Sequence, residues 1–325
     1  MSSHGYLLAT RGFVLSDVPP DRRAAAVESS ILELAELAEG SGYASVWAGD
    51  SVLAKPRLDP LTTLSAAAVA TESVRLGTAV YLPTLRHPAT VAHQTATVDL
   101  LSDGRFEFGV GVGTGDQVRD ECAQLDLPYG QRGPALDETL DIVTALWEGE
   151  SVDYDGQLFE LSDAGIGFGP AHTPPIHVAS SAFDPEKGFP PHIGDRLVEY
   201  ATGWLPLSVS PDIYEQALAR IRDLVAEGGG DPDRIKPMYY QDVVVADSER
   251  AALEEAHEFL DDYGAVPRSS VDGPYPFADR GAFGPPETVR EHLDRYENAG
   301  VEQFVIRFPS YDQETQLRRY ADLID

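Results

Sequence analysis

Apolar and polar residues alternate along the chain in short runs that switch between two periods. Continuous or alternating apolar runs predict strands, and apolar residues every three or four positions predict amphipathic helices. The strand pattern falls at residues 4–10, 43–48, 74–82, 105–112, 174–180, 201–207, 238–247 and 301–308. The helical pattern falls at residues 21–40, 59–73, 87–104, 133–150, 192–201, 210–230, 248–263, 285–300 and 314–325. Asp59 is expected to cap the second of these helices, ahead of Pro60 in its first turn.

This order of elements predicts the fold class. About eight strand–helix units follow one another in a single chain of 325 residues, which favours a closed parallel (β/α)8 barrel (a TIM barrel) over an open doubly wound sheet. Residues 1–325 are therefore expected to form one domain. Three stretches, at about 150–175, 182–191 and 264–285, are too long for ordinary connections and are expected to be insertions at the C-terminal face that carry function or disorder.

The chain is strongly acidic: it has 54 acidic and 24 basic residues, which give a formal net charge of −30. The acids are spread along the predicted helices, and lysine is nearly absent. This composition is typical of halophilic archaeal proteins, whose acidic surface is stable where salt screens its self-repulsion; a cation-binding surface is the alternative. Phosphate backbones would be repelled, so nucleic acid is not an expected partner.

Several features restrict the class of protein further. No apolar run approaches the roughly 18 residues that a membrane helix needs, and the N-terminal residues lack the basic flank of a secretory signal. The single cysteine, Cys122, rules out an internal disulfide and fits a reducing compartment. No pair of histidines has metal-ligand spacing. We therefore expect a cytoplasmic protein with neither a membrane nor a metal partner.

The glycines of residues 105–116, "RFEFGVGVGTGD", raise the question of function. Glycine weakens a buried strand, so four of them at its end indicate that a ligand or another segment approaches the backbone there. In a (β/α)8 barrel the active site lies at the C-terminal ends of the strands. A ligand-binding turn and a simple tight turn both fit this pattern, which lacks the glycine spacing of a dinucleotide fold.

The sequence resembles the bacterial-luciferase-like superfamily. Residues 42–116 carry the resemblance continuously, and residues 132–161, 174–180, 201–206 and 284–308 extend it in family order. The resemblance implies an oxidoreductase that transfers a hydride between the deazaflavin coenzyme F420 and a small organic substrate; the halophilic composition favours F420 over FMN. The alternatives are an FMN-dependent monooxygenase that uses reduced flavin and oxygen, and a non-catalytic accessory flavin-binding barrel.

The resemblance also implies where the cofactor binds. The ring would pack on strand three, at a bulge that carries a non-proline cis peptide in the deazaflavin enzymes and falls here at Ala79–Val80. The turn after strand four, Gly113, Thr114 and Gly115, would lie beside the ring. The cofactor's phosphate would be received by the small residues Ala179, Ser180 and Ser181, whose backbone amides and hydroxyls suit an anion.

Three residues are candidates for catalysis. Asp116 matches an acid that could deliver or take the proton accompanying hydride transfer. Asp50 either hydrogen-bonds near the ring or braces its loop, and His87 precedes a helix-opening Pro88 close to the expected mouth. Many relatives carry Asp-His after strand two, and in some sugar-phosphate dehydrogenases that histidine is the proposed base. Ser51 stands there in this chain, which counts against a mechanism using that base.

The remaining expectations concern substrate and assembly. A methylene-tetrahydropterin or methylene-tetrahydrofolate is one possible substrate, but the acid that such reductases carry in strand one has no counterpart in residues 6–13. Arg307 and Ser51 are the candidate substrate-binding residues; Arg307 would hold a carboxylate or phosphate, or else pair with one of the many acids. The family commonly pairs through helices of the first half, so a homodimer or higher homo-oligomer is expected.

Overall fold

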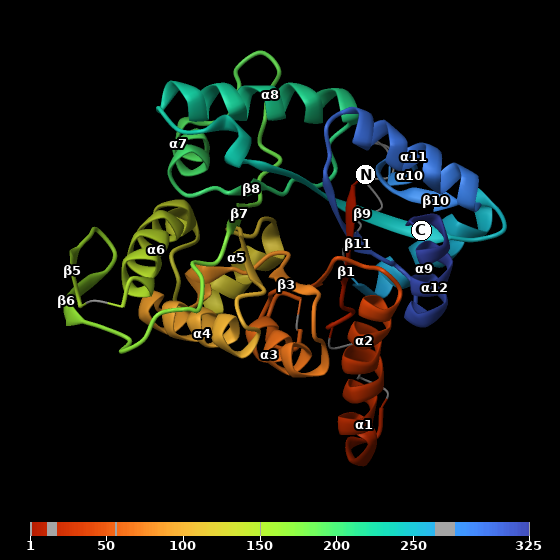
Figure 1. Cartoon of the computed structure of the whole chain (residues 1–325), viewed down its shortest axis with the longest axis horizontal. Helices are drawn as coiled ribbons and strands as arrows, with labels where there is room; N and C mark the ends of the chain where they lie inside the picture. The colour runs from red at the N-terminus through yellow and green to blue at the C-terminus, as the bar shows by residue number, and fades with distance from the viewer. Residues whose placement is uncertain (1, 12–17, 56, 150, 264–276, 325) are drawn as a thin grey trace.

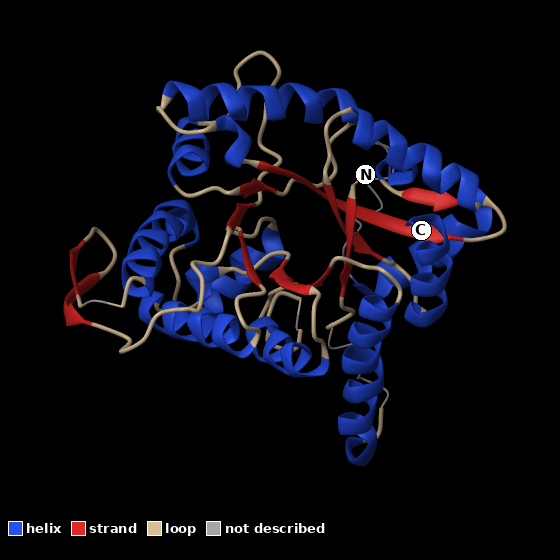
Figure 2. Cartoon of the chain, in the orientation of Figure 1, coloured by secondary structure: helices blue, strands red, loops and turns tan. Residues whose placement is uncertain are grey.

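Eight parallel strands close into a barrel in the computed structural model, which describes residues 2–11, 18–55, 57–149, 151–263 and 277–324. Figure 1 shows the barrel strands, and Figure 2 shows them in red within a surround of blue helices. The barrel strands are β1 (Ser3–Leu7), β2 (Ser45–Ala48), β3 (Arg75–Thr78), β4 (Phe106–Val110), β7 (Ile176–Val178), β8 (Gly203–Trp204), β9 (Lys236–Val245) and β11 (Gln303–Arg307). They pair in the order β11-β1-β2-β3-β4-β7-β8, and β9 closes the ring by pairing with both β8 and β11. The predicted (β/α)8 barrel is confirmed.

Helices cover the outside of the barrel. They are α1 (Arg23–Val27), α2 (Glu33–Gly40), α3 (Pro60–Ala70), α4 (Pro88–Leu101), α5 (Asp116–Gln124), α6 (Arg132–Trp147), α7 (Pro191–Glu199), α8 (Pro211–Glu227), α9 (Glu249–Tyr263), α10 (Phe277–Arg280), α11 (Pro286–Asn298) and α12 (Gln313–Ile324). A turn of π-helix, η3 (Glu28–Leu32), joins α1 to α2. Asp59 caps α3 as predicted, because its carboxylate accepts a hydrogen bond from the Thr62 amide at 2.9 Å. None of the helices within the described ranges combines the length and apolar character that crossing a bilayer requires.

Short connecting helices and three strands complete the described elements. The single-turn 3-10 helices are η2 (Pro20–Arg22), η4 (Pro83–Leu85), η5 (Tyr129–Gln131) and η6 (Pro232–Arg234). The stretch 150–175, expected to be an insertion, contains an antiparallel hairpin of β5 (Val152–Asp155) and β6 (Glu160–Ala164). Within 264–285, residues 264–276 lie outside the described residues; α10 and the strand β10 (Ala282–Gly284), which pairs with β9, make up most of the remainder.

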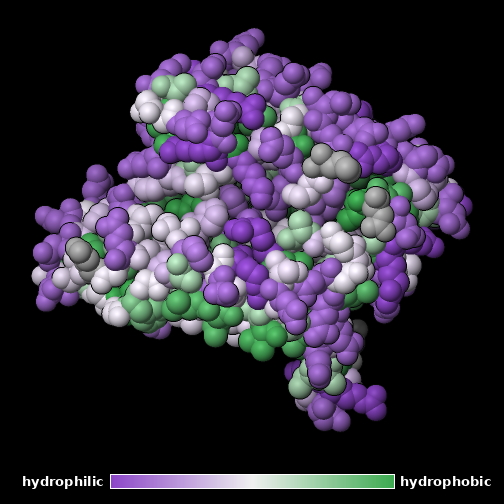
Figure 3. Space-filling view, in the orientation of Figure 1, coloured by the Kyte–Doolittle hydropathy of each residue, from purple (hydrophilic) through white to green (hydrophobic). Residues whose placement is uncertain are grey.

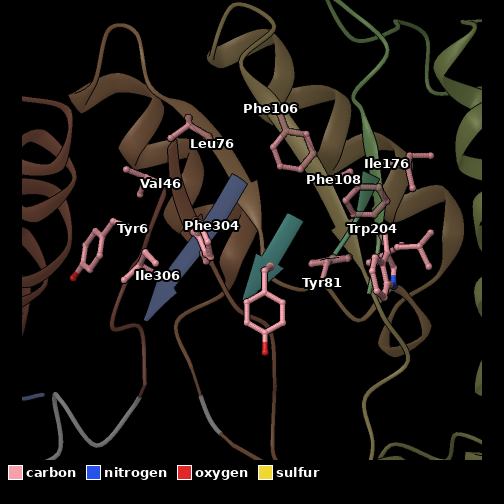
Figure 4. Packing of buried hydrophobic residues seen from close by; sticks show 14 of the residues in the cluster. Tyr6, Val46, Leu76, Tyr81, Phe106, Phe108, Ile176, Trp204, Phe304 and Ile306 are labelled. Atoms are coloured by element: carbon pink, nitrogen blue, oxygen red, sulfur yellow. The ribbon is translucent and has the colours of Figure 1, made fainter. Parts of the chain in front are cut away.

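Side chains of the barrel strands alternate between two hydrophobic cores. Tyr6 and Phe304 belong to the large cluster packed between the strands and the helices, and Figure 4 shows both among its members. The next residues along the chain, Leu7 and Val305, belong to a smaller cluster together with Trp47. Burial on both faces makes each strand an almost continuous apolar run, which is why the strands could be predicted from the sequence.

The indole of Trp47 fills the inside of the barrel. It is fully buried, and its Nε1 donates a hydrogen bond to the Ser45 hydroxyl at 2.7 Å. A Cβ placed on Gly77 would lie only 2.1 Å from the indole Cζ3 atom. Glycine in β3 therefore makes room for the ring, and the ring in turn packs against Ala79, which follows β3.

Candidate functional site

A cavity of about 340 Å³ lies at the carboxyl ends of the barrel strands. Its walls come from the segments that follow β2, β3, β4 and β8, from the first turns of α5, from α10, and from β9 and β11. These segments are far apart in the sequence, and the closure of the barrel brings them to one face. The position is that of the active site in (β/α)8 barrels.

The floor of the cavity is the segment that follows β3. Ala79 and Val80 line the cavity, and the peptide bond between them is cis, as the resemblance implied. Ala79 belongs to the same apolar cluster as Trp47, and Val80 packs against that cluster. The floor is therefore small and apolar, and it rests directly on the barrel core.

The glycine-rich turn after β4 forms a neighbouring wall. A Cβ on Gly109 would lie 1.9 Å from the backbone oxygen of Thr78, so β4 needs glycine there to approach β3. Gly113 has a φ of 63°, and it lines the cavity together with Thr114. Gly115, with a φ of 94°, is the residue that precedes α5. The glycines of this turn thus serve both a close strand contact and a bare cavity wall.

Asp50 is held by a guanidinium at the edge of the cavity. Arg86 donates to both of its carboxylate oxygens, through Nη1 to Oδ2 at 2.6 Å and through Nη2 to Oδ1 at 3.1 Å. The Leu82 amide donates to Oδ2 at 3.0 Å, and Arg86 also contacts Asp59 at 3.1 Å. Burial raises the pKa of the Asp50 carboxyl, and Arg86 opposes that effect. These hydrogen bonds brace the loop, and Asp50 also belongs to the lining of the cavity.

The other two catalytic candidates lie outside the lining of the cavity. Asp116 is the exposed first residue of α5, two positions beyond the lining residue Thr114. His87 is exposed and caps α4, where its Nδ1 accepts a hydrogen bond from the Ala89 amide at 3.2 Å. Its ring also contacts that of Phe159 edge-on, with centroids 5.7 Å apart. The structure therefore gives His87 a capping position.

The expected phosphate loop lies beside the cavity. Ser181 exchanges two hydrogen bonds with Leu207, donating to its backbone oxygen at 2.7 Å and accepting from its amide at 3.1 Å, and Leu207 lines the cavity. The Ser180 hydroxyl accepts from the amide of Ala182 at 3.2 Å. The amide of Ala179 donates to Val110 in the barrel ladder at 2.9 Å, so this donor is already used.

Basic side chains dominate the charged part of the lining. Four of them, Lys55, Arg57, Arg280 and Arg307, face the cavity together with the acids Asp50 and Asp242. In a chain with a formal net charge of −30, an excess of basic over acidic groups at one cavity marks it as a place for an anion.

The two residues expected to bind substrate both line this cavity. Arg307 pairs with Asp242 through two hydrogen bonds of 2.5 and 2.7 Å, so the alternative of an ion pair with an acid is present at the cavity wall itself. The Ser51 hydroxyl accepts a hydrogen bond from the Lys55 amide at 2.8 Å, which turns the segment after β2 back on itself. Among the described residues, no group of three or more His, Cys, Asp or Glu side chains is arranged to hold a metal ion.

Sequence reasoning assigned no role to Lys55, Arg57, Asp242 or Arg280. A signal was present for the first two, because the segment "LAKPRLD" after β2 places two basic residues together in a chain that has very few lysines. Asp242 also stood out as a charge within the apolar run of β9. Nothing comparable marked Arg280, which follows the residues that the structure does not describe.

The chain is similar in sequence to some known proteins and in architecture to some solved structures. An F420-dependent glucose-6-phosphate dehydrogenase of Beutenbergia cavernae is 30% identical over 321 residues, which cover 90% of this chain and 91% of the relative. The monooxygenase RslO1 from Streptomyces bottropensis matches in structure with a TM-score of 0.82 and 21% identity, over 99% of this chain and 98% of its own.

An F420-dependent secondary alcohol dehydrogenase, solved in complex with an F420–acetone adduct, has a TM-score of 0.78 and 18% identity, with 99% of this chain and 98% of the other covered. The barrel, the cis peptide at the cavity floor and the glycine turn agree with what the sequence resemblance implied. The sequence model of luciferase-like monooxygenases matches residues 10–303, and the chain belongs to this family.

Proposed function

We propose that the chain is an oxidoreductase that transfers a hydride between F420 and a small organic substrate carrying an anionic group. The observation that carries this proposal is the cavity above Ala79 and Val80, which combines an apolar floor with a wall of basic side chains. The F420-dependent dehydrogenase that matches 90% of the chain supports the choice of cofactor.

The cavity fits a flat ring system. Its floor at Ala79 and Val80 and its wall at Gly113 offer small side chains or bare backbone, while Leu82 and Val118 supply apolar surface. A volume of about 340 Å³ lies within the range of small-molecule and cofactor sites. When bound, F420 would supply the ring carbon that accepts or donates the hydride.

The protein's own residues then have distinct tasks. The segment after β3 and the turn after β4 orient the ring, and Asp50, braced by Arg86, keeps the segment after β2 in register with them. Asp116 is the proposed proton donor or acceptor, because it lies in the first turn of α5 next to the turn that lines the cavity. With Ser51 at the position of the family's histidine, the imidazole base of the sugar-phosphate dehydrogenases is replaced by a group that cannot act as a base near pH 7.

The basic wall selects the substrate. Lys55 and Arg307 reach the cavity from the segment after β2 and from β11, so a carboxylate or phosphate between them would be attracted by both charges. Ser51 offers a hydroxyl to the same space. The phosphate of the cofactor would instead lie toward Ser180 and Ser181, beside the cavity.

The test is a fluorescence-quench titration of the purified protein in molar KCl, with F420 and then with FMN. Tight binding of F420 together with weak binding of FMN supports the proposal. Preference for FMN would instead indicate an oxygen-consuming monooxygenase. Binding of neither cofactor overturns the proposal. F420 reduction is then measured with alcohols that carry a carboxylate, alcohols that carry a phosphate, and neutral alcohols. Lys55→Gln should raise the KM of the anionic substrates about tenfold, whereas Lys187→Gln, the same change at an exposed lysine, should not.

We also propose that the enzyme is a cytoplasmic homodimer that requires high salt. Figure 3 shows apolar residues gathered along the lower edge of the molecule, where α3 and α4 lie in Figure 1. Val69 of α3 is 80% exposed, and Leu100 and Leu101 of α4 are about half exposed. An apolar surface of this kind on two adjacent helices is expected to be covered by a second copy of the chain.

A further inference from the structure

A buried carboxylate joins two walls of the cavity. Glu121 lies on α5, it is 1% exposed, and its Oε1 accepts hydrogen bonds from three consecutive backbone amides after β2. The distances are 2.8 Å to Val52, 2.5 Å to Leu53 and 3.2 Å to Ala54. Consecutive amides that converge on one oxygen form a concave anion site, here filled by the protein's own side chain.

Within the part of the chain that the structure describes, few other contacts hold residues 52–54 in place. The side chains of Val52 and Leu53 are 41% and 42% exposed, so neither is buried in a core. The Ser51–Lys55 turn is closed internally by the Ser51 hydroxyl, but that bond does not attach the turn to the rest of the barrel. Hydrogen bonds to an ionised group are stronger than ordinary ones. The carboxylate of Glu121 is therefore the main attachment of the segment to α5.

The two segments that this attachment joins, one after β2 and one that leads into α5, both contribute residues to the cavity wall. On one side Ser51, Ala54 and Lys55 belong to the lining; on the other, Thr114 and Val118 do, the latter one turn before Glu121. Glu121 itself is not among the lining residues. Its effect on the cavity acts through the segment that it holds.

We propose that Glu121 is a positioning residue, whose carboxylate fixes the Ser51–Lys55 segment against α5 and so holds Ser51 and Lys55 at the cavity wall. The inference rests on the proposed function only for the consequence that the cavity then binds F420. The second carboxylate oxygen of Glu121, Oε2, is buried and accepts no hydrogen bond from the described residues. The three amides therefore use one oxygen alone, and an amide side chain of the same shape would keep that acceptor but lose the charge.

The test compares variants of the full-length protein in molar KCl. Glu121→Leu removes the acceptor, Glu121→Asp keeps the charge but shortens its reach, and Glu121→Gln keeps an acceptor oxygen in place. Asp120→Leu is the matched control, because Asp120 is the exposed neighbour on the same helix. Hydrogen exchange reports the protection of the amides at 52–54, with those of β4 as an internal reference, and fluorescence quenching reports the dissociation constant of F420.

We expect exchange at 52–54 to accelerate at least tenfold in Glu121→Leu and Glu121→Asp, with β4 unchanged and the dissociation constant of F420 raised about fivefold or more. Glu121→Gln keeps an acceptor without the charge, so it should lie between the wild type and Glu121→Leu in both measurements, and Asp120→Leu should change neither. The aspartate variant serves if the leucine variant does not fold.

Unchanged exchange at 52–54 would overturn the proposal, as would faster exchange in β4 to the same extent. Faster exchange at 52–54 with an unchanged dissociation constant of F420 would overturn the positioning role: Glu121 would then stabilise the segment without affecting the cavity. If the wild type binds neither F420 nor FMN, the proposed function fails, while the exchange data still decide whether Glu121 holds the segment.

Discussion

Arg307 and Asp242 face each other across neighbouring strands at the wall of the cavity. They are paired positions of β11 and β9, and the guanidinium donates through Nε to Oδ1 at 2.5 Å and through Nη2 to Oδ2 at 2.7 Å. Both side chains are about one-sixth exposed, at 16% and 17%. Asp242 therefore orients the guanidinium and also cancels part of the charge that it presents to an anion.

This pair predicts opposite effects of two neutralising substitutions. Asp242→Asn removes a negative charge at the cavity and should lower the KM of an anionic substrate, while Arg307→Gln should raise it, each about fivefold. Steady-state reduction of F420 by the anionic substrate, at one fixed KCl concentration, measures both. A higher KM in both variants would contradict the electrostatic account and assign the pair to holding the shape of the wall.

The contact between Trp47 and Gly77 predicts a large loss of stability. Gly77→Ala would place a Cβ 2.1 Å from a ring carbon of the indole, and overpacking of a rigid core costs about 1–3 kcal/mol or more. Gly40→Ala is the matched control, since a Cβ there meets nothing within 4 Å. Urea unfolding at constant KCl should show the loss for Gly77 only; equal stability of the two variants would show that the indole can move aside.

The order of strands and helices could be predicted from the sequence because most of the elements have strong apolar patterns. Several elements, among them α5, β5 and β6, were not predicted because their apolar patterns are weak. The buried face of α5 has only Val118 and Cys122 as apolar groups, beside the carboxylate of Glu121. The strands β5 and β6 pair outside the barrel and have no fully buried residue, so neither shows an apolar run.

The cavity was predictable only in part. Residues that belong to a local motif, such as Ala79, Gly113 and Thr114, line the cavity as expected. The hydrogen bonds of Arg86 to Asp50 join residues 36 positions apart. Those of the amides at 52–54 to Glu121 join residues 67–69 positions apart, and no local pattern encodes such pairings. Asp116 begins α5 and His87 precedes α4, and neither residue belongs to the lining of the cavity.

A buried ionic contact inside the barrel predicts how stability depends on pH. Burial disfavours the charge of Glu107, but the His177 ring at 3.0 Å, Lys236 at 3.6 Å and Arg75 together lower its pKa to about 2. This pKa lies below that of the unfolded chain, so the unfolded state binds the proton first. The contribution, about 3 kcal/mol, is complete above about pH 5 and is lost as the pH falls toward 2.

Glu107→Gln should therefore lower the free energy of unfolding at pH 7 and flatten its decline between about pH 5 and pH 3. Glu314→Gln is the control, because Glu314 forms an exposed pair with Arg318 one helical turn away. Urea unfolding at a series of pH values measures both slopes. An unaltered slope in Glu107→Gln would show that other carboxylates account for the acid dependence.

The net charge of −30 predicts a requirement for salt. The Debye length grows from about 3 Å in 1 M salt to about 10 Å in 0.1 M, so repulsion between neighbouring acids is released on dilution. Far-ultraviolet circular dichroism should show unfolding as KCl is lowered to about 0.1 M and refolding when it is restored. Sucrose at equal osmolality should not replace KCl, because it leaves the charges unscreened; a melting temperature independent of KCl would contradict the halophilic assignment.

The exposed apolar surface of α3 and α4 predicts the interface of a dimer. Val69 of α3 is 80% exposed, so Val69→Asp would bury a charge between the two copies while leaving the fold of each untouched. Light scattering in molar KCl should give twice the monomer mass for the wild type and the monomer mass for Val69→Asp. Ala226→Asp adds the same charge on α8, at the opposite end of the molecule in Figure 1, and should remain a dimer. A monomeric wild type would contradict the proposed dimer. A Val69→Asp variant that stays dimeric would place the contact elsewhere, because a charged group at the centre of an apolar interface is tolerated only where it finds a partner.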